Sequence, residues 1–332
     1  MSAASTSLVR ELRPRIIERR ARLEVAARAL PTGYFADLLA EIDAALLRID
    51  QGSFGICETC HDPIEADRLE HNPLVRFCLD HLSAGQLRAH EQDLELATRI
   101  QATLLPATDL AAGDWQTFYR YQPAGVVGGD YCEVVAHGDG NSLFFAVGDV
   151  AGKGVAASLL MTHLSAIFRS LLSLDLPLAD LIARANRLFC ESTPATHFAT
   201  LAAGRTTPDG VELCNAGHCP PLLLRGGAAE PIEATGVPLG LFCSAPYLVR
   251  SIQLAPGDSL VLYSDGITEA QDPAGNPYEE AGLIASLRAH ARQDANALVD
   301  GVLSDLARFR SSAPQQDDIT LLYIRRTAGR SQ

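Results

Sequence analysis

The stretch that decides the fold is Asp130-Tyr-Cys-Glu-Val-Val-Ala-His-Gly-Asp-Gly-Asn-Ser-Leu-Phe-Phe-Ala-Val-Gly-Asp149. Two β-rich runs, residues 131–136 and 143–147, are separated by His-Gly-Asp-Gly-Asn, and this pattern predicts a β-hairpin. In an antiparallel hairpin the start of the first strand lies beside the end of the second strand. The sequence therefore predicts that the carboxylates of Asp130 and Asp149 meet at one edge of a sheet.

Two further aspartates stand at the ends of apolar runs. Asp265 follows the run 259–263, and Asp317 precedes the run 319–324. Each aspartate alone could be a turn or capping residue, but carboxylates gathered at one point repel each other and normally need a cation between them. Hard oxygen ligands without a nearby His or Cys series select Mg²⁺ or Mn²⁺. The four aspartates together predict a metal-dependent enzyme.

Composition narrows the class of protein. A length of 332 residues with 47% hydrophobic residues favours two or more packed units. No run approaches the roughly 18 apolar residues of a membrane span, and the first residues lack the apolar core of a signal peptide, so we expect a cytoplasmic protein without a membrane partner. The net charge of −13 argues against direct nucleic-acid binding. Eight cysteines in a chain of this length indicate metal ligands or core residues rather than a disulfide scaffold.

The sequence divides into four expected parts. Residues 1–51 carry two amphipathic helical patterns around a break at 31–33, which indicates either a helical hairpin within the chain or a coiled-coil dimer interface. Residues 52–82 form a compact cysteine segment. Residues 83–106 predict a linker helix, and residues 107–328 mix strands with helices, so the fold class is α+β.

The expected linker helix carries an apolar stripe, made of Leu87, Leu94, Ala97, Ile100 and Leu104. An amphipathic helix between two domains must bury its stripe, and pairing with a second copy of the chain is the simplest way to do so. The pattern therefore predicts a homodimer.

The cysteine segment contains two ligand pairs. Cys57 and Cys60 are separated by two residues, as are Cys78 and His81, and seventeen residues lie between the pairs. This spacing predicts one tetrahedral zinc ion held by three thiolates and one imidazole. Four protein ligands leave no open position, so we expect a structural ion rather than a catalytic one.

Residues 44–82, including Ile-Asp-Gln-Gly-Ser-Phe-Gly-Ile-Cys-Glu-Thr-Cys, resemble a DksA/TraR-type zinc finger. The fourth ligand of that family is usually Cys, whereas His81 stands there in this chain. Members of the family bind RNA polymerase through a long coiled coil with acidic residues at its tip. This chain lacks so long a hairpin, so the resemblance implies a module for dimerisation or signal reception.

Six motifs between residues 107 and 326 resemble the metal-dependent protein phosphatases (PPM family), in the branch of stage II sporulation protein E and RsbU. The motifs are Gly-Gly-Asp130-Tyr, Gly-Asp149-Val-Ala-Gly-Lys-Gly, Asn-Ala-Gly-His218-Cys-Pro-Pro, Gly-Val-Pro-Leu-Gly240, Tyr-Ser-Asp265-Gly-Ile-Thr-Glu and Asp317-Asp-Ile-Thr. The resemblance implies an α/β/β/α sandwich of two antiparallel sheets. The implied reaction is hydrolysis of phosphoserine or phosphothreonine on a protein.

The resemblance also implies two Mn²⁺ or Mg²⁺ ions at the catalytic site. Asp149 would bridge them, with the carbonyl of Val150 assisting. Asp130 would complete one ion, while Asp265 and Asp317 would complete the other. These four aspartates are the expected catalytic residues.

Three polar residues near the motifs need an interpretation of their own. Asp318 follows Asp317, strand alternation points the two side chains opposite ways, and motif position selects Asp317 as the ligand. His218 is a candidate general acid, but it lies in a turn, and we interpret it as structural. Lys153 either contacts phosphate or is solvated, and the sequence leaves both alternatives open.

For the substrate, the resemblance implies a phosphorylated regulatory protein, possibly a small anti-sigma-factor antagonist, with hydrolysis regulated through the zinc-finger and coiled-coil module. The same site could hydrolyse a small-molecule phosphate. The alternative from another class is a zinc-finger adaptor linked to transcription, in which the phosphatase fold serves only as a scaffold.

Overall fold

The computed structural model describes residues 3–29, 33–81, 84–137, 140–194 and 196–328. The chain forms two compact units, Met1–Asp93 and Leu94–Gln332, and each is described by itself. Three expected features lie outside the described residues: the break at Pro31-Thr32, the hairpin tip at Gly138-Asp139 and the start of the linker at Ser83.

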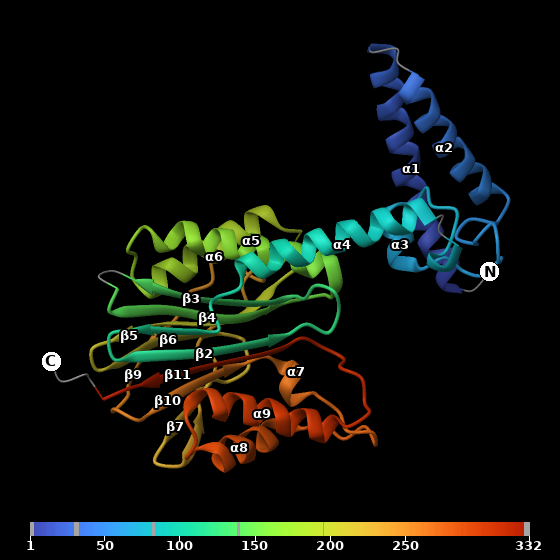
Figure 1. Ribbon diagram of the computed structural model, residues 1–332. Coiled ribbons are helices and arrows are strands. Elements are labelled where there is room, and N and C mark those ends of the chain that lie inside the picture. The colour runs from blue at the N-terminus through green and yellow to red at the C-terminus, as the bar shows by residue number, and fades with distance from the viewer. Residues whose placement is uncertain (1–2, 30–32, 82–83, 138–139, 195, 329–332) are drawn as a thin grey trace. The chain divides into compact units, whose positions relative to one another are not determined.

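The first unit contains a helical hairpin within one chain. Its elements are α1 (Ala3–Ala29), α2 (Gly33–Asp50), α3 (Ala66–His71) and the short 3-10 helix η1 (Leu79–His81). Helices α1 and α2 lie side by side (Figure 1), and Arg20 of α1 pairs with Asp43 of α2 at 2.6 Å. One small core joins the hairpin to the cysteine segment, made of Leu12, Ile16, Ile42, Phe54, Cys57, Ile64, Leu69 and Cys78.

Helix α4 (Ala84–Leu104) corresponds to the expected linker helix. The division between the two units falls inside this helix, between Asp93 and Leu94, so its second half belongs to the larger unit. That half is fixed there by its side chains, which the next subsection describes.

The larger unit contains two antiparallel sheets. The first has the order β1-β2-β11-β10-β7-β8, and the second has the order β3-β4-β5-β6-β9. The strands are β1 (Asp109–Ala112), β2 (Trp115–Gln122), β3 (Asp130–His137), β4 (Ser142–Val150), β5 (Ala199–Thr207), β6 (Gly210–Ala216), β7 (Leu222–Arg225), β8 (Ala228–Pro231), β9 (Arg250–Gln253), β10 (Ser259–Tyr263) and β11 (Ile319–Arg326).

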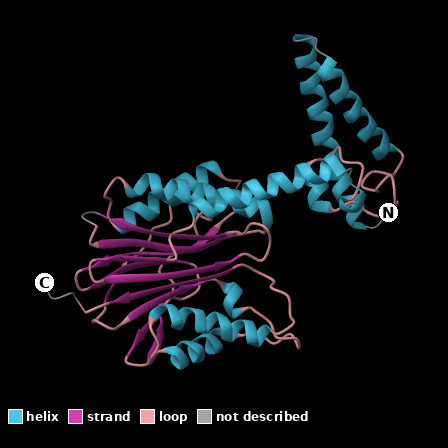
Figure 2. Cartoon of the chain, viewed as in Figure 1, coloured by secondary structure: helices cyan, strands magenta, loops and turns pink. Residues whose placement is uncertain are grey.

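Helices cover the outer face of each sheet (Figure 2). They are α5 (Gly154–Leu172) and α6 (Leu178–Ser192) on the second sheet, with α7 (Asp265–Thr268), α8 (Glu279–His290) and α9 (Ala295–Arg310) beside the first. One apolar core lies between the sheets, and one lies under each helical layer. Strand β4 is buried on both faces for this reason, which explains its nearly unbroken apolar run. The predicted α/β/β/α sandwich is confirmed.

Among the described residues, helix α5 has the length and apolar content of a membrane span. Its buried side chains, which include Met161, Leu164 and Phe168, pack against the second sheet. Its composition is therefore explained by its place in the core of the sandwich.

Candidate active site

The predicted hairpin brings two aspartates into register. Strands β3 and β4 pair antiparallel with Asp130 directly opposite Asp149. Asp130 is 3% exposed, and Thr320 of the other sheet donates a hydrogen bond to its Oδ2 at 2.5 Å. Burial, together with the nearby charge of Asp149, raises the pKa of Asp130 well above its usual range.

Asp265 and Asp317 come to the same edge from the first sheet. Burial and the charges of Asp265, Asp317 and Asp318 raise the pKa of Asp149 to about 7. Burial, Glu269 and Asp317 raise the pKa of Asp265. Carboxylates from both sheets therefore lie close enough to repel one another, and a divalent cation is the group that such a donor set fits.

The four aspartates do not form a compact cluster of metal ligands. Among the described residues, the one group of three or more His, Cys, Asp or Glu side chains with ligand atoms all within 4.8 Å of one another is in the first unit. The wider spacing of the aspartates agrees with their mutual repulsion, so side-chain shifts would be needed to close them around ions.

The adjacent residues Asp317 and Asp318 point to different partners. Asp318 is buried, and its two oxygens accept hydrogen bonds at 2.7 Å from the backbone N–H groups of Ala124 and Gly129. A Cβ at Gly128 would lie 2.0 Å from Asp318 Oδ2, so only glycine fits there. Asp318 thus holds the loop that precedes Asp130, whereas the side chain of Asp317 is 40% exposed.

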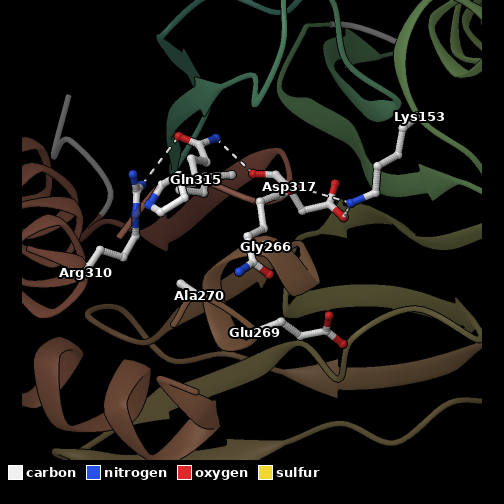
Figure 3. Close-up of a pocket in the computed structure, with 10 residues that line it drawn as sticks. Lys153, Gly266, Glu269, Ala270, Arg310, Gln315 and Asp317 are labelled. Atoms are coloured by element: carbon white, nitrogen blue, oxygen red, sulfur yellow. Dashed lines mark hydrogen bonds and ion pairs between the residues drawn. The ribbon is translucent and has the colours of Figure 1, made fainter. Parts of the chain in front are cut away.

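The cation beside Asp317 is Lys153, whose Nζ lies 2.7 Å from Asp317 Oδ2. Figure 3 shows this pair at one side of a small cavity that Glu269 and Arg310 also line. The hydrogen bond to Asp317 raises the pKa of Lys153, so its ammonium stays charged at neutral pH.

Val150 is the last residue of β4, directly after Asp149. Its carbonyl oxygen lies 3.4 Å from the position that a Cβ would take at Gly129. The carbonyl therefore faces the Gly-Gly-Asp130 loop. A carbonyl that assists in binding a metal ion beside Asp130 would have to face this loop.

His218 is held in the interior behind Asp149. Its Nδ1 is 2.9 Å from Thr200 Oγ1, and that hydroxyl oxygen is 3.3 Å from the backbone nitrogen of Asp149. Burial lowers the pKa of His218 to about 4, so the ring is neutral at pH 7. These contacts support the structural interpretation of His218 over the general-acid one.

Gln101 of α4 is a positioning residue that the sequence did not indicate. Its Nε2 donates to the Gly128 carbonyl at 2.7 Å, and its Oε1 accepts from the Gly128 N–H at 3.1 Å. It is 5% exposed, whereas Ile100, on the apolar stripe predicted to pair with a second copy, is 49% exposed in the single chain. The side chain of Gln101 is therefore buried on α4, because its amide forms two hydrogen bonds with the backbone of Gly128.

The cluster in the first unit consists of the four predicted zinc ligands, Cys57, Cys60, Cys78 and His81. Cys60 Sγ and Cys78 Sγ are 3.7 Å apart, and Cys78 Sγ is 3.1 Å from His81 Nδ1. Two thiolates on one tetrahedral zinc would be roughly 3.8 Å apart, given Zn–S bonds of about 2.3 Å. The residues present fit a structural zinc ion.

The raised pKa values predict how stability depends on pH. Asp149 has a pKa of about 7 when folded and about 3.9 when unfolded, so the folded state binds its proton more tightly. The stability of the manganese-free larger unit should therefore fall as pH rises from about 4 to about 7. Mn²⁺ needs ionised carboxylates, so the stabilisation it gives should grow over the same range.

Thermal unfolding of zinc-loaded, manganese-free protein at pH 5.5 and pH 8 checks this. We expect the higher Tm of the larger unit at pH 5.5 without Mn²⁺, and the larger Mn²⁺-induced increase at pH 8. Equal Tm values at both pH values without Mn²⁺ would contradict the crowding of the carboxylates.

Comparison with known proteins agrees with this geometry. Residues 139–327 match the family described as stage II sporulation protein E, and residues 52–80 match the prokaryotic dksA/traR C4-type zinc finger. The chain is 27% identical over 247 residues to the phosphoserine phosphatase RsbU of Bacillus subtilis, covering 71% of this chain and 70% of that protein.

Two further relatives extend the comparison. Protein IcfG of Synechocystis is 27% identical in an alignment of 268 residues that covers 70% of this chain but only 41% of IcfG. The crystal structure of the RsbU and RsbW domains of a Mycobacterium tuberculosis protein superposes with a TM-score of 0.59 at 29% identity. That superposition covers 68% of this chain and 63% of the other, so the chain spans less than two thirds of both of these relatives.

Proposed function

This chain belongs to the stage II sporulation protein E family of protein phosphatases, and from this premise we propose that it is a Mn²⁺- or Mg²⁺-dependent protein serine/threonine phosphatase. The observation that carries the proposal is the convergence of Asp130, Asp149, Asp265 and Asp317 from two sheets, where burial and neighbouring carboxylates raise the pKa values of Asp130, Asp149 and Asp265. Relatives named phosphoserine phosphatase support the same reaction.

The positions of the side chains support the proposed ligand assignments. Asp149 sits between Asp130 of its own sheet and Asp265 and Asp317 of the other, so it is the residue able to bridge two ions. Asp130 and the carbonyl of Val150 would hold one ion, while Asp265 and Asp317 would hold the other. Two divalent ions, when bound, supply an activated water and neutralise charge on the phosphoryl group.

The surrounding residues position these ligands. Thr320 holds the carboxylate of Asp130, and Asp318 fixes the backbone that leads into it. Thr200 holds the backbone of Asp149. These hydrogen bonds fix the backbone that carries the ligands, so reorganisation when the ions bind would be confined to the aspartate side chains.

For the substrate, we propose a phosphoserine or phosphothreonine on a small regulatory protein such as an anti-sigma-factor antagonist. A cavity of about 390 Å³ opens beside Asp149 and is rimmed by Leu94, Val126 and Val155. Val126 is 53% exposed and Val155 is 44% exposed. An apolar rim around a charged centre fits a protein segment that carries a phosphate, and it supports this class over a small-molecule phosphate.

The proposal is tested by phosphate release from a phosphoserine peptide and from p-nitrophenyl phosphate, with and without Mn²⁺. We expect release that requires the metal. Binding of the peptide without release at any Mn²⁺ concentration would contradict it.

We further propose a cytoplasmic homodimer in which α4 connects the zinc-finger module to the catalytic site. Leu96 and Ile100 are one helical turn apart on α4 and about half exposed, so they present an apolar face for a second copy. Gln101, on the same helix, holds Gly128 beside Asp130. Movement of α4 would therefore shift the backbone that positions Asp130.

Replacing both Leu96 and Ile100 with Asp should give monomers with a changed Mn²⁺ requirement, because the charges cannot be buried against a second copy. Light scattering and a Mn²⁺ titration measure the two effects. Ala102→Asp, on another side of the same helix, is the matched control and should remain dimeric. Dimers with unaltered metal dependence in the double variant would rule the mechanism out.

A further inference from the structure

Lys153 is the one lysine of the chain, and it lies in the loop between β4 and α5. Its Nζ contacts Asp317 Oδ2 at 2.7 Å and donates to the Gln316 carbonyl at 3.0 Å. Gly152 and Gly154 on either side have φ values of 120° and 69°, and a Cβ at either position would meet nothing within 4 Å. The backbone on either side of the lysine is therefore not covered by other atoms at these two glycines.

The ammonium stands between two cavities. The first, of about 70 Å³, is lined by residues that include Gly266, Glu269 and Arg310. The second, of about 390 Å³, is lined by Gly129 and Asp149 among others, and Lys153 and Asp317 line both. A group bound at the aspartates from either cavity would thus meet Lys153.

The position of Lys153 matters because the site carries an excess of negative charge. Burial and neighbouring carboxylates raise the pKa values of Asp149 and Asp265, and a phosphomonoester brings further negative charge. Among the ion pairs of the described residues, the one that reaches these aspartates is Lys153–Asp317. Arg310 lines the first cavity, but its guanidinium is turned to Gln315 (Figure 3).

The Lys153–Asp317 ion pair can exchange partners. The Lys153 side chain is 69% exposed and that of Asp317 is 40% exposed, and exposed ion pairs contribute little to stability. A lysine ammonium is a compact charge on a flexible four-carbon stem, so it can move to a new anion without moving the backbone. A divalent ion bound by Asp317 would release it for this purpose.

We propose that Lys153 binds a non-bridging oxygen of the substrate's phosphoryl group, and that without metal its ammonium takes the place of a divalent ion at Asp317. The proposal rests on the proposed function, because it assigns the phosphate-binding residue of that same site. It makes two separate claims, competition with metal and contact with phosphate.

Three variants of the full chain separate these claims. Lys153→Gln removes the charge at similar length, Lys153→Arg keeps it, and Arg187→Gln removes one exposed charge from α6 outside both cavities. Binding of Mn²⁺ is measured by electron paramagnetic resonance. Inhibition by inorganic phosphate and the KM for a phosphoserine peptide are measured on the Mn²⁺-loaded protein.

For Lys153→Gln we expect Mn²⁺ to bind about three- to tenfold more tightly, because a competing and repelling charge is lost. We expect the inhibition constant of phosphate and the KM of the peptide to rise about tenfold, with a smaller fall in kcat. For Lys153→Arg, the Mn²⁺ affinity, the phosphate inhibition constant and the KM should stay within about threefold of the wild-type values. For Arg187→Gln, all three should equal the wild-type values.

In Lys153→Gln, tighter Mn²⁺ binding with an unchanged phosphate inhibition constant would overturn the claim that Lys153 contacts phosphate. Only the claim that it competes with metal would then stand. No change in either quantity would overturn the whole proposal. If the wild type binds Mn²⁺ but hydrolyses no phosphomonoester, the proposed function fails. Calorimetric binding of inorganic phosphate to the Mn²⁺-loaded variants then decides the role of Lys153, with no difference between wild type and Lys153→Gln overturning it.

Discussion

Replacing Asp149 with Asn lowers kcat for Mn²⁺-dependent phosphate release at least about 100-fold, because the substitution removes the one carboxylate assigned to both ions. The fold should survive and even gain stability without metal. Asp149 has a raised pKa, which means that its ionised form is disfavoured by burial and by Asp265, Asp317 and Asp318. An uncharged amide of the same shape relieves that repulsion. Turnover and the Tm of metal-free protein measure the two effects.

Two comparison variants sharpen this result. Asp318→Asn disturbs hydrogen bonds to the N–H groups of Ala124 and Gly129, so it should lower stability by about 2 kcal/mol. Asp180→Asn, an exposed residue in the first turn of α6, should change neither quantity. More than a tenth of wild-type turnover in Asp149→Asn would remove the bridging assignment.

The second large effect is expected in the first unit. Cys57→Ser should lose the zinc ion and unfold residues 52–82, because Cys57 is fully buried in the small core of that unit. Structural zinc contributes roughly 10–16 kcal/mol of binding free energy in small modules, which is as large as the whole stability of a typical domain. Elemental analysis should find about one zinc per wild-type chain and none in the variant.

Hydrogen exchange localises the unfolding. Exchange should increase across residues 52–82 of Cys57→Ser and stay unchanged in the sandwich, which has its own cores. Cys243→Ser changes an exposed cysteine outside the cluster and should keep its zinc. A wild-type chain without zinc, or a Cys57→Ser chain that retains it, would refute the zinc-finger interpretation.

The sequence was sufficient where local patterns determine the structure. The turn between two β-rich runs predicted the register that places Asp130 opposite Asp149, and the spacing of the Cys57 and Cys78 pairs predicted the cluster. Both features depend on neighbours along the chain. The two-sheet sandwich was predicted through the family motifs rather than from periodicity.

Features that depend on tertiary contacts were not predictable. Gln101 and Gly128 are 27 residues apart, and a polar residue beside an apolar stripe gives no sign that it will be turned inward. Alternation predicted different directions for Asp317 and Asp318, but only the fold reveals that Asp318 holds a loop almost 200 residues earlier in the chain.

The central claim is that the converging aspartates hold two catalytic divalent ions, and the most direct test counts them. Zinc-loaded protein is titrated with Mn²⁺ under electron paramagnetic resonance, and phosphate release from a phosphoserine peptide is measured in the same samples. We expect two Mn²⁺ per chain beyond the zinc, with hydrolysis that rises as the second ion binds and is lost in Asp149→Asn. A chain that binds no Mn²⁺ at millimolar concentration, or that hydrolyses the peptide equally well without it, would contradict the account.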